Sequence, residues 1–155
     1  MSKIAIIILN YNSSADCRKC VGFLLRQQGV DLEIIIVDNC SRPDDRQAVE
    51  VLCKEHGLTY ISAKENRGYN AGNNIGLRYA TEKEYKYAMI ANPDMEFPQE
   101  NYVARMVEKM EEDEEIVVCG SDIVTPEGRH QNPQRESTYQ EELLWPITYL
   151  RYHRK

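Results

Sequence analysis

Apolar runs and amphipathic stretches alternate along the chain from residue 4 to residue 119. The runs at 4–9 and 32–37 are continuously apolar and rich in β-branched side chains, which is typical of strands covered on both faces. Shorter runs at 58–62, 87–91 and 116–119 predict three more strands. Apolar residues recur at helical spacing between the runs, most clearly after Pro98. The pattern predicts an α/β protein with a mostly parallel sheet and helices on both faces.

Local signals predict where the helices begin and end. Ser13 or Ser14 can cap the helix after the first strand, and Gly29 can close it. Ser41 can cap the second helix, whose first turn contains Pro43. Beyond the last predicted strand the sequence becomes polar and irregular. We therefore expect a ligand-binding subdomain over residues 1–125 and a connecting tail over residues 126–155.

Charge limits the partners. The net charge of −6 argues against a nucleic-acid partner, whose phosphates require a basic surface. An acidic protein that binds a pyrophosphate needs a metal ion or backbone N–H groups to offset the repulsion. The run Glu111–Glu115 follows a predicted helix, so we interpret it as a solvated turn and not as a metal site.

Cysteine usage and the first residues favour a cytoplasmic protein. No secretory signal precedes the first strand, and the number of cysteines, five, is odd, so we expect reduced thiols. Cys17 and Cys20 form a CxxC pair that could indicate zinc or redox chemistry. Because the pair lies in a helical pattern and no second CxxC accompanies it, we interpret it as packing.

Polar residues follow three of the predicted strands. These segments are Asn10-Tyr11-Asn12, Asp38-Asn39 and Asn92-Pro93-Asp94. In an open parallel sheet, ligands bind beyond the carboxyl ends of the strands. Asn and Asp also form turns, which is the alternative for each segment taken alone. Together the three segments predict a shared ligand cleft.

The side chains in these segments suit a nucleotide and a metal ion. Tyr11 offers a ring on which a base can stack, and Asp38 can accept a base N–H or a ribose hydroxyl. Arg67 and Gly68 open a predicted helix, where phosphate groups bind favourably. The carboxylate of Asp94 can hold Mg²⁺ or Mn²⁺ while phosphate oxygens fill the other positions.

These motifs, with the segment 66–74 (NRGYNAGNN), resemble family-2 glycosyltransferases, specifically the rhamnosyltransferase-like branch. The resemblance follows the family's order from residue 3 to about residue 135 and implies a GT-A fold. It places Asn92-Pro93-Asp94 at the family's Asp-X-Asp element, with Asn92 in place of the first acid. It implies Mn²⁺ or Mg²⁺ as cofactor at Asp94 and an inverting transfer from a dTDP- or UDP-linked sugar to a glycan or lipid-linked cell-envelope acceptor.

The expected site residues fall into two groups. Those expected to bind the nucleotide are Asn10, Tyr11, Asn12, Asp38, Arg67, Gly68 and Asn74. Those expected at the sugar and diphosphate are Asn70, Asn92 and Asp94. The resemblance places the general base well after the Asp-X-Asp element, where this chain offers no matching acidic motif, so we expect the donor site without the catalytic base.

Two alternatives stay open at this point. The chain could bind nucleotide sugar without turning it over, or it could be a sugar-phosphate nucleotidyltransferase. The second is disfavoured because the first strand is not followed by a Gly- and Arg/Lys-rich loop. The apolar segment Leu143–Ile147 could associate with a second copy of the chain, and together with the basic end it offers a contact to the inner face of the membrane.

Overall fold

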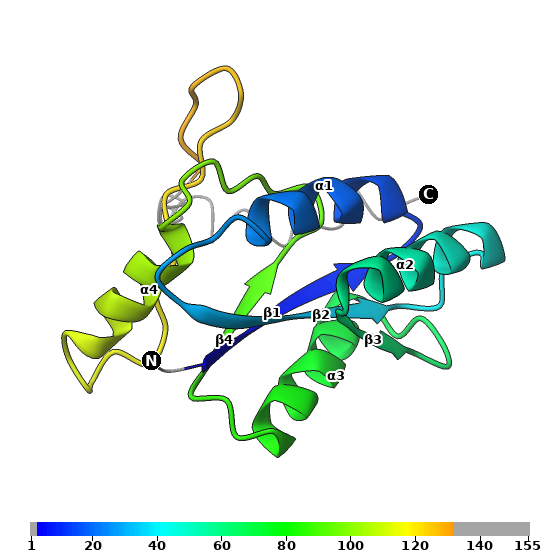
Figure 1. Cartoon of the computed structure of the whole chain (residues 1–155), viewed down its shortest axis with the longest axis horizontal. Helices are drawn as coiled ribbons and strands as arrows, with labels where there is room; N and C mark the ends of the chain where they lie inside the picture. Colours follow the sequence, from blue (N-terminus) through cyan, green and yellow to red (C-terminus); the bar gives the residue numbers. More distant parts are fainter. Residues whose placement is uncertain (1–2, 132–155) are drawn as a thin grey trace, which may run out of the picture. The chain divides into compact units, whose positions relative to one another are not determined.

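The computed structural model of the chain describes residues 3–131. Strands and helices alternate as the sequence predicts, and four strands form one parallel sheet in the order β3-β2-β1-β4 (Figure 1). The elements are β1 (Lys3–Asn10), α1 (Ser14–Leu24), β2 (Asp31–Asp38), α2 (Pro43–His56), β3 (Thr59–Ser62), α3 (Tyr69–Glu82), β4 (Tyr87–Ala91) and α4 (Tyr102–Glu111). The chain therefore has the α/β fold class that the hydrophobic pattern indicates.

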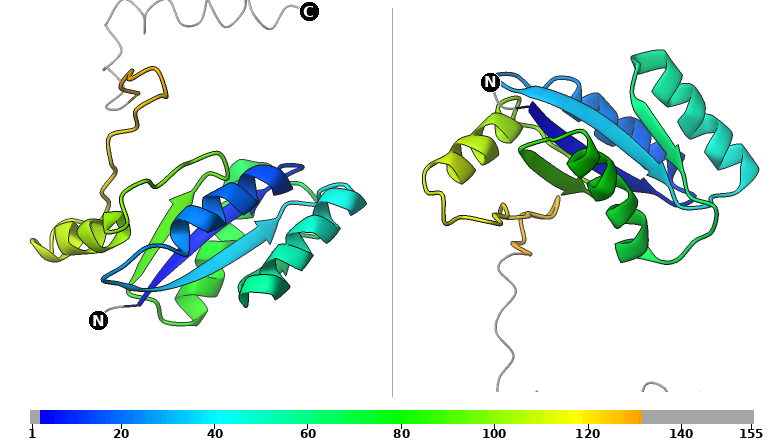
Figure 2. Two further views of the ribbon diagram at one scale, coloured as in Figure 1. Left: turned by 45° about the horizontal axis from the view of Figure 1, so that its top comes forward. Right: turned by 90° about the horizontal axis from the view of Figure 1, so that it is seen from below.

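Two apolar layers cover the two faces of the sheet. Ile4, Ile6 and Ile8 of β1 pack with α1 and α2 on one face. Ala5, Ile7 and Leu9 pack with α3 on the other. Figure 2 shows this arrangement, with α1 and α2 on one side of the sheet and α3 on the opposite side. Because both faces are covered, β1 and β2 tolerate continuously apolar sequences.

Helix α3 lies close to β1 because two of its glycines face the sheet. A Cβ atom added at Gly72 would stand 2.4 Å from Leu9 Cδ1, and one added at Gly76 would stand 2.5 Å from Ile7 Cγ2. The backbone at Gly72 therefore packs against Leu9 and Asn39.

Two predicted elements differ from the structure. Helix α1 ends at Leu24, well before Gly29, because the chain turns away and Gln27 binds the start of α4. The Gln27 side chain accepts a hydrogen bond from Val103 N at 2.9 Å and donates one to Gln99 O at 2.8 Å. The run 116–119 forms no strand among residues 3–131, and the Val117 side chain is 84% exposed.

The chain divides into two compact units, Met1–Val117 and Val118–Lys155. In the second unit, the described residues form a short turn in which Val124 and His130 make an antiparallel bridge. His130 Nδ1 lies 2.5 Å from Asp122 Oδ2 in the same turn. Our boundary at residue 125 stays a prediction, and the apolar segment Leu143–Ile147 lies outside the described residues.

The five cysteines are free thiols. Cys17 and Cys20 are fully buried in the layer between the sheet and α1. Burial raises the pKa of both thiols to about 12, so they are protonated at neutral pH and are poor nucleophiles. This supports packing as the role of the CxxC pair. The acidic run 111–115 is exposed at and after the end of α4, as expected of a solvated turn.

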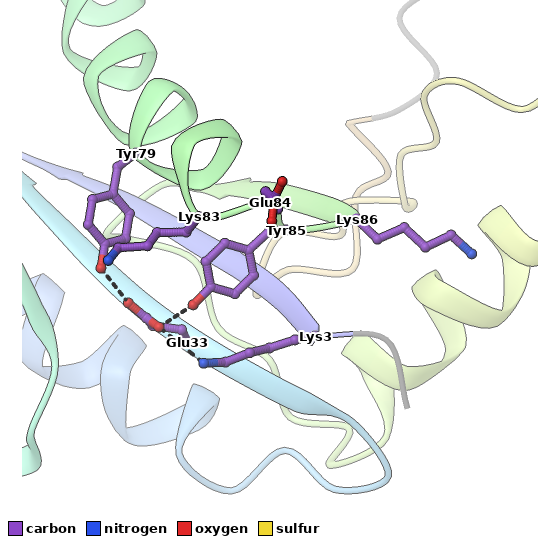
Figure 3. Close-up of a pocket in the computed structure, with 7 residues that line it drawn as sticks. All are labelled: Lys3, Glu33, Tyr79, Lys83, Glu84, Tyr85 and Lys86. Atoms are coloured by element: carbon purple, nitrogen blue, oxygen red, sulfur yellow. Dashed lines mark hydrogen bonds and ion pairs between the residues drawn. The ribbon is translucent and has the colours of Figure 1, made fainter.

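Glu33, near the start of β2, joins several elements at the amino end of the sheet. Its carboxylate accepts hydrogen bonds from Lys3, Thr59 and Tyr79 at 3.2, 2.7 and 3.1 Å, and also from Tyr85. Figure 3 shows Lys3, Tyr79 and Tyr85 pointing toward Glu33. These four residues are among those that line a cavity of about 470 Å³. Partial burial alone would raise the pKa of Glu33, but these bonds outweigh it and lower the pKa to about 2.

We expect Glu33→Gln to lower the free energy of unfolding at pH 7 by about 1–2 kcal/mol. A carboxylate with a lowered pKa stabilises the fold fully above its ordinary pKa near 4.5, and this contribution is lost as the pH falls toward 2. The free energies of unfolding of the wild type and the variant, measured with urea, should therefore converge as the pH falls from about 4.5 toward 2. Glu84→Gln, in the same cavity wall, removes a charge without these bonds and should change stability by less than about 0.5 kcal/mol at any pH.

Candidate functional site

The strand order brings the three predicted polar segments to one edge of the sheet. Asn10, the last residue of β1, pairs with Asp38, the last residue of β2. On the other side of β1, Ile8 pairs with Ala91, which ends β4 immediately before Asn92. The helices cross from one face to the other between β3 and β4, so β1 and β4 flank the point where the strand order reverses. This is the position at which open α/β sheets bind ligands.

Asn10 is the centre of a buried polar network. Its side chain is completely buried, and its Nδ2 lies 3.0 Å from Asp38 Oδ1, 3.0 Å from Ser41 Oγ and 2.8 Å from Asp45 Oδ1. Its Oδ1 accepts a bond from Ser13 N at 3.2 Å. A buried amide with this many partners orients its neighbours rigidly. Asn10 therefore contributes to the site by holding the segments around it.

Asp38 is likewise held inside the protein. Its side chain is 0% exposed, and its Oδ2 accepts bonds from Ser41 N at 3.2 Å and from Arg46 Nε at 3.3 Å. The partly exposed guanidinium of Arg46 compensates the charge of the buried carboxylate. These bonds leave Asp38 facing protein groups, so a direct bond from Asp38 to a base or ribose stays a prediction.

Ser41 does not cap α2, contrary to the sequence-based expectation. The N-cap residue is Arg42, and the Ser41 hydroxyl instead accepts bonds from Asn10 Nδ2 and from Asn12 N, the latter at 3.0 Å. Ser13 is the N-cap of α1 but makes no side-chain capping bond. Its place is taken by Asp45 Oδ2, which accepts a bond from Ser14 N at 2.9 Å. The sequence does not indicate these roles of Ser41 and Asp45, because the groups that they bind lie in the first βα unit while they lie in the second.

Tyr11 lies between Asn10 and Asn12 and is 52% exposed. Asn12 has a positive φ of 55°, and its Oδ1 accepts a bond from Arg42 N at 2.9 Å. The connector at residues 11–13 is therefore bound to the β2–α2 connection, while the Tyr11 ring faces solvent. An exposed ring on a fixed backbone suits stacking against a base.

The start of α3 is joined to the end of β2. Asn39 Nδ2 donates to Asn66 Oδ1 at 3.0 Å, and the same oxygen accepts a bond from Gly68 N at 2.9 Å. Gly68 is the N-cap residue of α3, with a φ of 89° that favours glycine. Arg67, the preceding residue, is exposed, and its Nε lies 3.7 Å from Glu65 Oε1. Asn70 and Asn74 are also exposed.

The turn after β4 carries the third segment. Asn92 Oδ1 accepts a bond from the Tyr69 hydroxyl at 2.7 Å, which joins this turn to the first residue of α3. Asn92 and Asp94 are exposed. The buried Cys20 of α1 contacts Asn92 O, with its Sγ at 3.8 Å. The negative charge of Asp94 adds to burial in raising the pKa of that thiol, which places the carboxylate near α1 as well.

Asp94 is the carboxylate best placed to bind a metal ion at this edge. Among residues 3–131, no group of three His, Cys, Asp or Glu side chains converges on one point. A Mg²⁺ or Mn²⁺ ion bound here would therefore take at most two of these side chains from the described residues and fill its other positions with water and phosphate oxygens, as such ions commonly do at phosphate sites. The exposed Asp94 fits this kind of site, with the amide of Asn92 two residues before it.

Comparison with known proteins agrees with this geometry. Residues 5–155 match the model of glycosyl transferase family 2. The chain belongs to this family. The motifs that suggested the resemblance therefore identified the family correctly from the sequence.

Two curated relatives illustrate the range of proteins that this chain is similar to. The chain is 33% identical over 102 residues to a low-salt glycan biosynthesis hexosyltransferase of Haloferax volcanii, covering 65% of this chain and 31% of that protein. It is 26% identical over 127 residues to the succinoglycan biosynthesis protein ExoO of Rhizobium meliloti, covering 81% of this chain and 35% of that protein. The chain thus spans about a third of the length of these relatives.

Solved structures show the same fold. The mannosyltransferase PcManGT of Pyrobaculum calidifontis, in complex with GDP-Man and Mn²⁺, superposes with a TM-score of 0.63 at 24% identity, over 69% of this chain and 32% of that chain. S. aureus TarS in complex with UDP-GlcNAc gives a TM-score of 0.60 at 21% identity, over 71% of this chain and 31% of that chain. The family-2 chain described here therefore has the GT-A fold.

Several groups at the site have no counterpart among the sequence-predicted residues of this family-2 chain. Ser41, Asp45 and Arg46 follow the segment Asp38-Asn39, and Asn39, Asn66 and Tyr69 lie within predicted segments but were assigned no role. All six are polar residues within or shortly after these segments, and this is the one signal that could have pointed to them. Within the described residues no helix is long and apolar enough to cross a bilayer.

Proposed function

We propose that this chain binds a nucleoside diphosphate sugar at the carboxyl ends of β1, β2 and β4, as the donor site of a sugar transferase. The observation that carries the proposal is the strand order, which makes Asn10 and Asp38 register partners and brings Asn92 and Asp94 to the same edge. Relatives named for hexosyl transfer and for glycan biosynthesis support the reaction class.

The nucleotide is held by the first two segments and the start of α3. Tyr11 stacks on a pyrimidine base of a UDP- or dTDP-linked sugar, and the network of Asn10, Asn12 and Asp38 shapes the wall beside it. The diphosphate lies at the beginning of α3, where Arg67, Gly68 and the free N–H groups of the first turn offset its charge. Asn70 and Asn74 line this part of the site.

The sugar and the metal ion lie at the turn after β4. Asp94 holds Mn²⁺ or Mg²⁺, which supplies positive charge to the departing diphosphate when it is bound. Asn92, fixed by Tyr69, faces the sugar. An acceptor hydroxyl of a glycan or lipid-linked molecule attacks the anomeric carbon from the side opposite the diphosphate, so the configuration is inverted. The base that takes the proton of this hydroxyl is not among the residues we assign.

Calorimetric titration tests this proposal. We expect UDP or dTDP to bind in the presence of Mn²⁺ and to bind at least about tenfold more weakly in EDTA. Asp94→Asn should abolish the difference between the two conditions, because it removes the carboxylate ligand. Asp113→Asn, in the exposed turn after α4, is the matched control and should behave like the wild type.

Each alternative result has a definite meaning. Equal affinity with Mn²⁺ and with EDTA would remove the metal role of Asp94. A chain that binds none of UDP, dTDP and GDP would contradict the donor site altogether. Binding accompanied by neither donor hydrolysis nor transfer to added glycans would favour a nucleotide-sugar-binding module over an active enzyme.

A further inference from the structure

One carboxylate holds both ends of the connector between β1 and α1. Asp45, in the first turn of α2, lies 2.8 Å from Asn10 Nδ2 through its Oδ1 and 2.9 Å from Ser14 N through its Oδ2. Asn10 is the last residue of β1 and Ser14 is the first residue of α1. The three residues between these two bonds include Tyr11.

The middle of the connector is bound from the same side. Asn12 N donates to Ser41 Oγ at 3.0 Å, and Arg42 N donates to Asn12 Oδ1 at 2.9 Å. Asn12 has a left-handed backbone conformation, with a φ of 55°, which residues other than glycine seldom adopt. The β2–α2 connection and the first turn of α2 thus bind the Asn10 side chain, Asn12 and the Ser14 N–H, and leave the Tyr11 ring exposed.

Asp45 is built to act as an anchor. Its side chain is largely buried, and burial alone would raise its pKa. Hydrogen bonds from Asn10 and Ser14, with the charge of Arg42, outweigh burial and lower the pKa, so the carboxylate stays ionised at neutral pH. A negative charge at the first N–H groups of α1 is also favourable.

We propose that Asp45 is a positioning residue of the nucleotide site, which fixes residues 10–14 so that Tyr11 is presented to the base. The inference rests on the proposed function, because it takes Tyr11 as the base contact. A connector that is ordered before the ligand arrives loses less conformational entropy on binding. Asp45 acts through Tyr11 in this proposal and does not touch the nucleotide.

The chain offers a matched pair of variants. Asp45→Asn keeps the shape of the side chain, but the amide nitrogen cannot accept one of the two bonds that the carboxylate accepts. Asp44→Asn removes the same charge from the same first turn of α2, at an exposed position. A difference between the two variants therefore reports the bonds to Asn10 and Ser14 and not the loss of charge near the helix start.

The test is a double-mutant cycle with Tyr11, read by titration with UDP in Mn²⁺. We expect Asp45→Asn to weaken UDP binding about tenfold, and Asp44→Asn to change it less than about twofold. In a Tyr11→Ala background, Asp45→Asn should weaken binding by less than about twofold more, because the residue through which it acts is gone. A purely structural role of Asp45 would not depend on Tyr11.

Failure of this inference can be told apart from failure of the proposed function. If the wild type binds UDP and Asp45→Asn binds it equally well, or if the loss is the same with and without Tyr11, the positioning role is wrong while the donor site stands. If the wild type binds no nucleotide, the donor site is wrong and Asp45 has nothing to position.

Hydrogen exchange checks the same role without a ligand. Backbone amides of residues 12–14 should exchange at least about tenfold faster in Asp45→Asn than in Asp44→Asn, while those of β1 stay protected. If Asp45→Asn does not fold, Asp45→Ser replaces it, since that variant also removes the carboxylate bound by Asn10 Nδ2 and Ser14 N. Unchanged exchange of residues 12–14 in the variant that folds would overturn the proposal.

Discussion

Replacing Asp38 by alanine is expected to lower the free energy of unfolding by about 3–5 kcal/mol. The carboxylate is completely buried, and it accepts bonds from Asn10 Nδ2, Ser41 N and Arg46 Nε. Alanine removes this acceptor from three donors, of which Asn10 Nδ2 and Ser41 N are buried and the Arg46 guanidinium is partly exposed. The loss of hydrogen bonds to a charged group and the uncompensated guanidinium both act in the same direction.

Urea unfolding followed by circular dichroism measures this effect. Asp31→Ala is the matched control, because Asp31 begins the same strand that Asp38 ends and is exposed. It should shift stability by less than about 0.5 kcal/mol. An Asp38→Ala protein within about 1 kcal/mol of the wild type would show that the carboxylate is not embedded in the network as described.

Gly76→Leu is the second large effect, with an expected loss of about 3 kcal/mol. A Cβ atom at position 76 would stand 2.5 Å from Ile7 Cγ2 and 3.0 Å from Ile7 Cγ1. Isoleucine is branched at Cβ, so these atoms cannot move aside by a simple rotation of the side chain. Helix α3 would have to lift away from β1, which would also disturb the start of the helix at Gly68.

Gly22→Leu provides the contrast within the same protein. Gly22 also lies inside a helix, but a Cβ atom there meets nothing within 4 Å. The substitution should stabilise the protein by roughly 0.5–1 kcal/mol, because glycine is a poor helix former. Thermal unfolding of both variants should therefore give shifts of opposite sign. Shifts of the same sign would contradict the close contact between α3 and β1.

The sequence predicted those parts of the fold that depend on local pattern. The continuous apolar runs of β1 and β2 are distinctive, because only strands covered on both faces tolerate them. Pro43 marked the first turn of α2 correctly. The run 116–119 has the composition of a strand, but composition does not reveal whether a neighbouring strand is available. Gly29 suggested the end of α1, yet the helix ends at Leu24 because Gln27 is bound to the start of α4.

The candidate site was predicted to a similar extent. Asn10, Asp38 and Asp94 were placed at strand ends by the pattern alone, and the parallel sheet brings those ends to one edge. The bonds between Asn10 and Asp38 could not be predicted, because they depend on the register of β1 against β2. Asp45 was missed for a related reason, since its partners lie about thirty residues earlier in the chain. Local sequence carries no signal for such a contact.

The bonds between the β1–α1 connector and the start of α2 have a consequence for protein engineering. Residues 10–14 and 38–46 are joined by hydrogen bonds, although α1 and β2 lie between them in the chain. A chimera of two family members whose crossover falls between residues 15 and 37 would combine halves of this assembly from different parents. Exchanging residues 1–46 as one block keeps both halves together, and this is the smallest N-terminal unit that recombination should treat as indivisible.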